Sequence, residues 1–309
     1  MFAHEFIRNA YLAGTFVALA CGGIGFFVVV RAQVFAGDAL SHVAFAGALG
    51  AAALGIDIRI GLFAATLAVA AGIGGLGRRA EAADDVAIGT VFAWILGLGA
   101  LFLSIFVSGS SGEDGTAAVR VLFGSILGLS AGDARLAAAV AIVACLALAA
   151  IARPLLFASL DPAVARGLGV PVWALGIGFF LILGAVAAEA TQAVGALLLL
   201  GLLAAPGGAA RLLTDRPWLG LGLAAAIAVG SMWLGLFLSY EIASLPAGTA
   251  VIGVATGIFL LAAIRDRLRA EGPPGRPAQR VRTFPYLRRQ TANAPEGVGA
   301  TPAGARLEG

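Results

Sequence analysis

Lysine is absent from this 309-residue sequence, and histidine and cysteine occur only twice each. Without lysine the chain cannot contain a phosphate-binding loop of the form G-x-x-x-x-G-K-[ST]. If the protein uses ATP, another polypeptide must therefore hydrolyse it. The histidines form no H-E-x-x-H motif, which argues against a metalloprotease. Cys21 and Cys145 lie inside apolar runs, where a thiol behaves as a small hydrophobe.

Charged residues are also scarce, at 12% of the chain, whereas 60% of the residues are hydrophobic and the mean hydropathy is +0.98. Apolar runs long enough to cross a bilayer, about 20 residues each, recur from residue 10 to residue 264. The sequence therefore predicts an all-α integral membrane protein with about nine transmembrane helices. They are expected at residues 10–30, 36–56, 59–77, 86–107, 134–152, 173–188, 193–210, 218–239 and 245–264.

The arginines are concentrated in alternate connections between these segments, and the positive-inside rule assigns those connections to the cytoplasm. We expect the N-terminus outside, the C-terminus inside, and a multi-pass protein of the bacterial cytoplasmic (inner) membrane. The start of the chain has no basic region before its apolar run, so it reads as a first transmembrane helix and not as a signal peptide. The net charge of +3 reflects topology and predicts no nucleic-acid partner. The cytoplasmic arginines are Arg31, Arg78, Arg79, Arg153, Arg166, Arg211, Arg216, Arg265, Arg267 and Arg269.

Two regions differ in composition from the apolar segments. Residues 271–309 are rich in Pro, Gly, Arg and Ala, which predicts a disordered cytoplasmic tail after a transmembrane permease domain of residues 1–270. Residues 108–133 contain a polar Ser/Gly loop and then an apolar stretch too short to span, which we expect to form a half-helix against the bundle.

Asp38 and His42, in the stretch "GDALSHVAFAG", are the most unusual residues of the membrane portion. Four residues apart on a helix, their side chains project from one face. A carboxylate and an imidazole suit zinc, manganese or iron, and two ligands would let a transported ion bind and leave. A hydrogen-bonded packing pair is the alternative, but ionisable groups inside a span usually mark a substrate or proton pathway.

A second unusual stretch, residues 153–173, lies between two spans on the predicted cytoplasmic side. Asp161 followed by Pro162 predicts the start of a short helix, which Gly167 or Gly169 can close. Such a helix either serves only to connect the two spans or docks into a partner. Glu189 and Glu241 fall at predicted outer ends of spans, where we expect solvated side chains.

Several blocks of the chain, in order, resemble the membrane permease subunits of the bacterial metal-ion ABC importers, the ABC-3 type that handles zinc, manganese or iron. They cover most of residues 10–264. The blocks are "FVVVRAQVFAGDALSHVAFAGALG", "VLFGSILGLSAGD", "LDPAVARGLGVPV", "VGALLLLGLLAAPGGAARLL" and "LSYEIASLPAGTAVIGVATGIFLL".

The resemblance implies a type II importer fold in which two copies of the chain form the pathway. It also implies two cytoplasmic ATP-binding cassette subunits and an extracytoplasmic metal-binding protein. The cargo would be a divalent metal ion, zinc first and manganese or iron next, with no permanently bound cofactor and no catalytic activity of the chain itself. By position, Asp38 and His42 would line the translocation site. The ATPase-coupling loop would comprise Ser159, Leu160, Asp161, Pro162, Ala165, Arg166, Gly167 and Gly169.

Two other functions remain open at this level. A permease for a metal chelate (siderophore, haem or cobalamin) would share the architecture, although a large chelate needs a wide path without ligands inside the membrane. A proton-coupled secondary carrier could use Asp38 and His42 as a relay, but it would need no docking helix.

Overall fold

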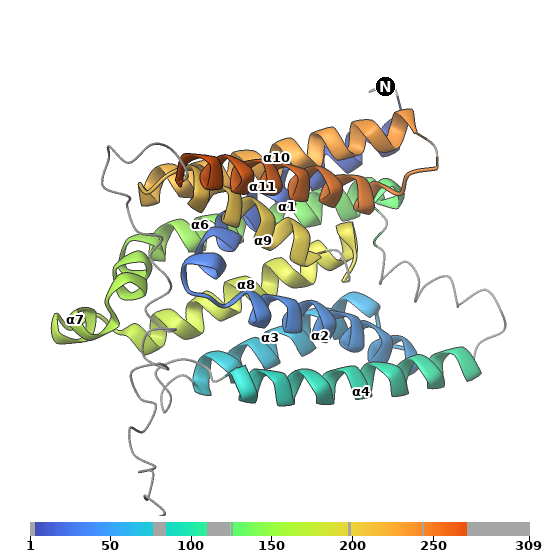
Figure 1. Cartoon of the computed structure of the whole chain (residues 1–309). Helices are drawn as coiled ribbons and strands as arrows, with labels where there is room; N and C mark the ends of the chain where they lie inside the picture. Colours follow the sequence, from blue (N-terminus) through green and yellow to red (C-terminus); the bar gives the residue numbers. More distant parts are fainter. Residues whose placement is uncertain are drawn as a thin grey trace, which may run out of the picture. The chain divides into compact units, whose positions relative to one another are not determined.

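The computed structural model describes residues 4–76, 85–109, 124, 126–196, 199–242 and 244–270. Every regular element in these ranges is a helix (Figure 1), and eight of the helices are long and apolar enough to cross a membrane. The chain divides into two units, Met1–Asp266 and Arg267–Gly309. The elements are α1 (Glu5–Val30), α2 (Val34–Ala53), α3 (Ile58–Leu76), α4 (Asp85–Gly109), η1 (Ile126–Gly128), α6 (Ala131–Leu160), α7 (Pro162–Gly167), α8 (Val172–Val194), α9 (Leu199–Leu213), α10 (Pro217–Glu241) and α11 (Ala247–Ala270).

The all-α membrane fold is confirmed, but the predicted segment 193–210 corresponds to a shorter helix. Helix α8 continues to Val194 and ends at Gly195, whose φ of 100° lies in the range that favours glycine. The following helix, α9, has 15 residues. At 1.5 Å per residue it is about 22 Å long, less than the hydrocarbon thickness of about 30 Å.

Helix α6 extends further than the sequence predicts at both ends. It begins after Ser130, whose hydroxyl accepts the Asp133 N–H at 3.2 Å, an N-cap that precedes the expected start. At the other end it continues through Pro154 to Leu160, and Figure 1 shows its last turns bending toward α7. Ser159 therefore belongs, with Leu160, to the final turn of α6 and not to a loop.

The predicted half-helix falls largely outside the described residues. What the structure describes there is a single 3-10 turn, η1, in which Ile126 is buried. The predicted disordered tail, residues 271–309, also lies outside the described ranges.

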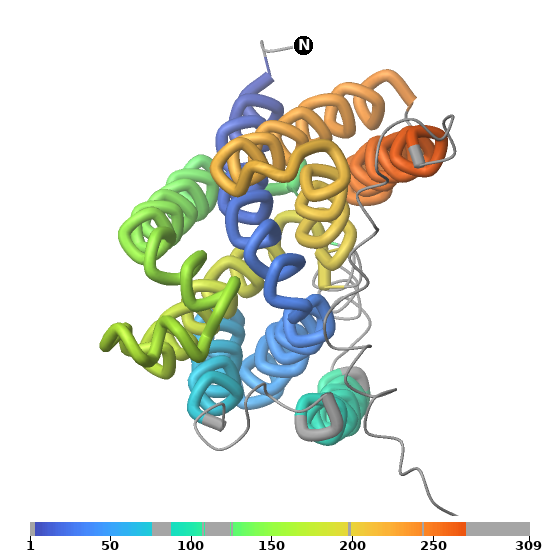
Figure 2. The backbone as a smooth tube through the Cα atoms, turned by 60° about the vertical axis from the view of Figure 1, so that its left-hand side comes forward, coloured from blue at the N-terminus to red at the C-terminus, as the bar shows by residue number. Residues whose placement is uncertain are grey.

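Helix α1 is the most enclosed of the eight candidate spanning helices, with 72% of an apolar 18-residue stretch buried. It packs against α6, α8, α9 and α10, and Figure 2 shows it between α6 on one side and α9 and α10 on the other. At its crossing with α9, a Cβ on Gly25 would overlap the Leu203 carbonyl oxygen, and one on Gly207 would come within 2.7 Å of the Gly25 oxygen. Small residues thus let the two backbones touch.

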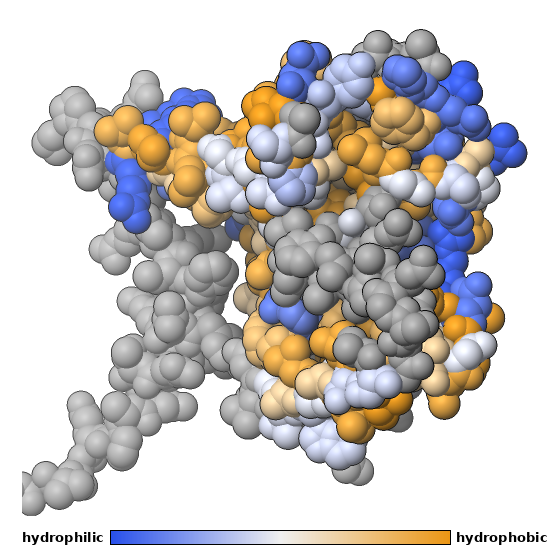
Figure 3. Space-filling view, turned by 90° about the vertical axis from the view of Figure 1, so that its right-hand side faces the viewer, coloured by the Kyte–Doolittle hydropathy of each residue, from blue (hydrophilic) through white to orange (hydrophobic). Residues whose placement is uncertain are grey.

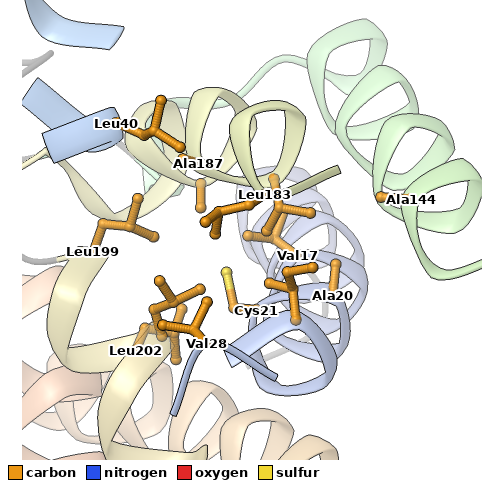
Figure 4. Packing of buried hydrophobic residues seen from close by; sticks show 14 of the residues in the cluster. Val17, Ala20, Cys21, Val28, Leu40, Ala144, Leu183, Ala187, Leu199 and Leu202 are labelled. Atoms are coloured by element: carbon orange, nitrogen blue, oxygen red, sulfur yellow. The ribbon is translucent and has the colours of Figure 1, made fainter. Parts of the chain in front are cut away.

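The core around α1 is apolar, as a helical membrane bundle requires. Figure 4 shows side chains of α1, α8 and α9 pointing toward one another around Cys21, which is fully buried and forms no disulfide. Large apolar side chains are also exposed on the outer surface, beside hydrophilic patches (Figure 3); Trp94 of α4 is 72% exposed. An apolar exterior is what contact with lipid demands.

Helix α2 contributes to a second group of helices with α3, α4 and α8. Buried Ala44 and Ala48 of α2 pack with Leu62 of α3 and Ala188 of α8. These contacts use one face of α2 and leave a different face, that of Asp38 and His42, less buried.

Candidate functional site

Asp38 and His42 lie one turn apart on α2, as the sequence predicts. The Asp38 Oδ1 and His42 Nε2 atoms are 3.9 Å apart, and the side chains are 26% and 16% exposed. That distance is too long for a hydrogen bond, so the Asp38 oxygen and the His42 nitrogen do not occupy each other's lone pairs. The geometry suits a pair whose oxygen and nitrogen both turn toward one ion.

The surroundings of the pair are apolar and restrict the imidazole. The His42 ring meets the Phe92 ring of α4 edge to face, with 5.2 Å between centroids, and Phe92 also packs against Phe35 at 5.6 Å. Buried Ser41 is not an additional free ligand, because its hydroxyl donates to the Asp38 carbonyl oxygen at 2.7 Å. The site of one chain therefore offers one carboxylate and one imidazole beside aromatic rings.

Within the described ranges no group of three or more His, Cys, Asp or Glu side chains comes close enough to hold a metal ion. Transition-metal ions take four or more ligands in protein sites. Two ligands from one chain leave at least two positions to be filled by water or by another molecule.

Helix α7 is the short helix that the sequence predicts after Asp161. The Asp161 Oδ1 accepts the backbone N–H groups of Ala163 at 3.1 Å and Val164 at 3.0 Å, and Pro162 occupies the first helical position. At the other end Gly169 has a φ of 80°. The predicted N-cap and glycine terminator are both confirmed.

The C-terminal end of α7 forms a Schellman motif. The Val170 N–H donates to the Ala165 carbonyl at 3.0 Å, and the Gly169 N–H donates to the Arg166 carbonyl at 3.0 Å. The Arg166 side chain returns to the same helix, donating to the Pro162 carbonyl at 3.2 Å. A six-residue helix is thus closed by hydrogen bonds at both ends.

Three apolar side chains on and beside α7 are exposed, and we call them the apolar face of α7. They are Leu160, Val164 and Leu168, which are 66%, 50% and 71% exposed. Val164 lies within α7, Leu160 is the last residue of α6 and Leu168 is the C-cap of α7. Ala165 is fully buried and faces the core instead. Figure 1 shows α7 projecting beyond the ends of its neighbours.

Arg31, which the sequence indicated only as a topology signal, and Arg59 each join several helices. Arg31, just after α1, donates to the Ser159 hydroxyl at 3.2 Å. Arg59, at the start of α3, pairs with Asp133 of α6 at 3.1 Å and donates to Gln192 of α8 at 3.1 Å. Their partners are 128, 74 and 133 positions away in sequence, so no local pattern could have revealed them.

Glu189 corrects the expectation of a solvated helix end. Its residue is only 3% exposed, and its Oε2 has no hydrogen-bond partner in the described structure. The neighbouring Gln192 Nε2 is likewise buried and unpartnered. Glu241, by contrast, is exposed at the end of α10, as expected. Because α8 is apolar on several faces, the pattern did not indicate which face is buried.

The described helices form an all-α, multi-pass membrane fold. Residues 3–266 match the model of the ABC 3 transport family, and the chain belongs to that family. It is therefore a component of a transporter.

Relatives and a solved structure agree with this assignment. The chain is 31% identical to the "Manganese transport system membrane protein MntC" of Halalkalibacterium halodurans, over 85% of this chain and 88% of the relative. It is 30% identical to the "Probable iron transport system membrane protein" of Haemophilus influenzae, over 86% and 95%. It is also similar to a chain of PsaBC from Streptococcus pneumoniae, solved in complex with Fab, with a TM-score of 0.72, 26% identity and coverage of 84% and 91%.

Proposed function

We propose that this chain is the membrane permease subunit of an ATP-driven importer of divalent transition-metal ions. The observation that carries the proposal is the Asp38–His42 pair on a spanning helix, 3.9 Å apart and partly exposed. Manganese and iron are favoured over zinc, which the sequence alone ranked first, because the similar proteins are named for manganese and iron transport. A carboxylate oxygen and an imidazole nitrogen suit both metals.

A second copy of the chain supplies the missing ligands in this proposal. One chain provides two donors, and two copies related by a two-fold axis provide four, two carboxylates and two imidazoles. Such a site is incomplete in each half, so separating the halves on one side would weaken the metal's coordination and release the ion.

The energy comes from separate ATP-binding cassette subunits, which dock on the apolar face of α7. The exposed side chains of Leu160, Val164 and Leu168, on and beside a six-residue helix that is closed by hydrogen bonds at both ends, fit a hydrophobic groove on a partner. The chain has no lysine, so it cannot hold a phosphate-binding loop of its own. An extracytoplasmic metal-binding protein would deliver the ion at the opposite side.

The proposed location is the bacterial cytoplasmic membrane, with the N-terminus outside and α7 and the C-terminus in the cytoplasm. The arginine distribution supports this orientation. Residues 1–270 then form the permease domain, and residues 271–309 form a cytoplasmic tail.

The test is metal accumulation in transporter-deficient bacteria that express the chain with its ATPase and metal-binding protein. Manganese, iron and zinc are offered separately and measured by mass spectrometry. We expect the wild-type protein to take up manganese or iron. In Asp38→Asn and in His42→Ala we expect uptake to fall at least about tenfold, because loss of one ligand weakens coordination by about 1.4 kcal/mol or more. An inactive ATPase should abolish uptake.

Matched controls are Asp215→Asn, an exposed aspartate between α9 and α10, and His4→Ala, the other histidine of the chain. Both should retain wild-type uptake. Full uptake in the Asp38 and His42 variants would reduce the pair to a packing role. Uptake that persists without ATPase activity would favour a proton-coupled carrier, and uptake of a chelate instead of bare ions would favour a siderophore, haem or cobalamin permease.

A further inference from the structure

Arg31 is the residue on which the further inference rests. It follows the last residue of α1, and its backbone N–H donates to the Phe27 carbonyl at 2.9 Å. The next residue, Ala32, has a φ of 55°, a left-handed conformation that is rare for a residue with a Cβ. The Gln33 N–H then donates to the Val28 carbonyl at 2.8 Å. The turn into α2 is therefore defined by backbone hydrogen bonds and is not a loose loop.

The Arg31 guanidinium contacts three different elements. Its Nη1 donates to the Ser159 Oγ at 3.2 Å, in the last turn of α6, and its Nε donates to the Gln33 Oε1 at 3.1 Å, at the N-cap of α2. Its Cζ lies over the Phe179 ring of α8, 5.1 Å from the centroid. A planar guanidinium can make these three contacts together, whereas an ammonium is a single point charge.

No carboxylate of the described residues lies within ion-pair distance of Arg31. Partial burial lowers the pKa of Arg31 from its ordinary value, but a guanidinium is not deprotonated in proteins, so Arg31 stays charged. A cation drawn partly out of water without a counter-ion is costly to hold, so its contacts with Ser159, Gln33 and Phe179 compensate for lost hydration.

These contacts connect the two functional regions of the chain. Ser159 lies two residues before Asp161, the N-cap of α7, and its own hydroxyl donates to the Leu155 carbonyl at 2.6 Å, which fixes it to α6. Gln33 lies five residues before Asp38 on the other side. Arg31 thus lies between the base of α7 and the start of the helix that carries the metal pair.

We infer that Arg31 is a positioning residue that couples displacement of α7 to the orientation of α2, and so to the Asp38–His42 pair. This inference rests on the proposed function, because that function gives α7 its ATPase contact. When α7 moves with the ATPase, Arg31 carries the start of α2 with the end of α6. Without it, the ATPase can still close on α7, but the metal pair no longer follows.

The experiment uses the full transporter, reconstituted in proteoliposomes with its ATPase and metal-binding protein, and measures metal ions imported per ATP hydrolysed. We expect Arg31→Ala to lower this ratio about tenfold while ATP hydrolysis stays within about twofold, since two hydrogen bonds and a cation–π contact are lost together. Arg31→Lys should recover only part of the ratio. Ser159→Ala should lower it about two- to fivefold, because one hydrogen bond is lost.

The matched control is Arg153→Ala, an exposed arginine on the same α6 helix, which should keep the wild-type ratio. In the double variant Arg31→Ala/Ser159→Ala we expect no loss beyond that of Arg31→Ala, because both changes remove the same joint. If Arg31→Ala does not reach the membrane folded, Ser159→Ala alone decides.

Two results would overturn the inference. One is an unchanged ratio in Arg31→Ala or, if that variant is unfolded, in Ser159→Ala. The other is a parallel fall of uptake and hydrolysis, which indicates a purely structural role. Failure of the proposed function is distinguishable, because the wild-type transporter would then import no metal with ATP at all.

Discussion

Arg31 precedes α2 and Arg59 follows it. Each arginine joins several helices, but the two use different kinds of contact. Arg59 pairs with Asp133, whose side chain is 42% exposed, so its charge is balanced where water and salt reach it. Arg31 has hydroxyl, amide and aromatic partners and no balancing carboxylate among the described residues. We therefore expect the contacts of Arg59 to tolerate substitution and those of Arg31 not to tolerate it.

Charge reversal at the two arginines is the strongest test of that comparison. In Arg31→Glu, a carboxylate would face the negative π surface of Phe179. This repulsion adds to the loss of the cation–π contact and of both hydrogen bonds, so we expect metal uptake to fall by more than the roughly tenfold expected for Arg31→Ala. In Arg59→Glu, a partly exposed carboxylate meets Asp133, and we expect a fall of only a few fold that high salt reduces.

Uptake assays at 0.05 M and 0.5 M salt, with membrane abundance matched, compare the two variants. Equal loss of uptake in both, insensitive to salt, would remove the distinction between the two ends of α2.

Glu189, at the predicted outer end of its span, extends the comparison to a buried carboxylate. This buried carboxylate has an unpartnered oxygen, and a buried polar group left unsatisfied costs about 1–3 kcal/mol, more when charged. We expect Glu189→Gln to raise the thermal midpoint of the purified protein by several degrees, at about 2–4 °C per kcal/mol. Glu241→Gln, at an exposed position, should not change it. A lower midpoint in Glu189→Gln would instead show that the carboxylate has a stabilising partner.

The smallest effect is expected from Asp133→Asn. An exposed ion pair contributes about 0–1 kcal/mol, so the thermal midpoint should fall by no more than about 4 °C. The fall should disappear in 1 M salt, where the screening length is about 3 Å. Asp215→Asn is the control, with no expected change at either salt concentration. A large fall that persists in 1 M salt would mean that the Arg59–Asp133 pair is shielded from solvent.

Much of the fold was predictable because apolar run length is a direct consequence of bilayer thickness. The errors came from tertiary context. Pro154 normally ends a helix, but α6 continues through it because the preceding and following turns are held in the bundle. The break before α9 depends on Gly195, one glycine among 44, and its φ could not be read from the sequence.

The candidate site shows the same difference between local contacts, which the sequence predicts, and long-range contacts, which it does not. Asp38 with His42 and Asp161 with Pro162 were found because their partners lie within four residues, where helix geometry determines which side chains meet. The contacts of Arg31 with Ser159 and of Arg59 with Asp133 connect residues more than 70 positions apart, and a single sequence contains no record of such pairs.

The closed ends of α7 also determine what a partner encounters. Asp161 accepts two of the first N–H groups, and the N–H groups of Gly169 and Val170 donate to carbonyls of the last turn, so the helix keeps its shape by local hydrogen bonds. Binding to it requires no coil-to-helix ordering, and the associated entropy loss is avoided. A partner that binds α7, as proposed above, would therefore meet the same preformed surface at each encounter.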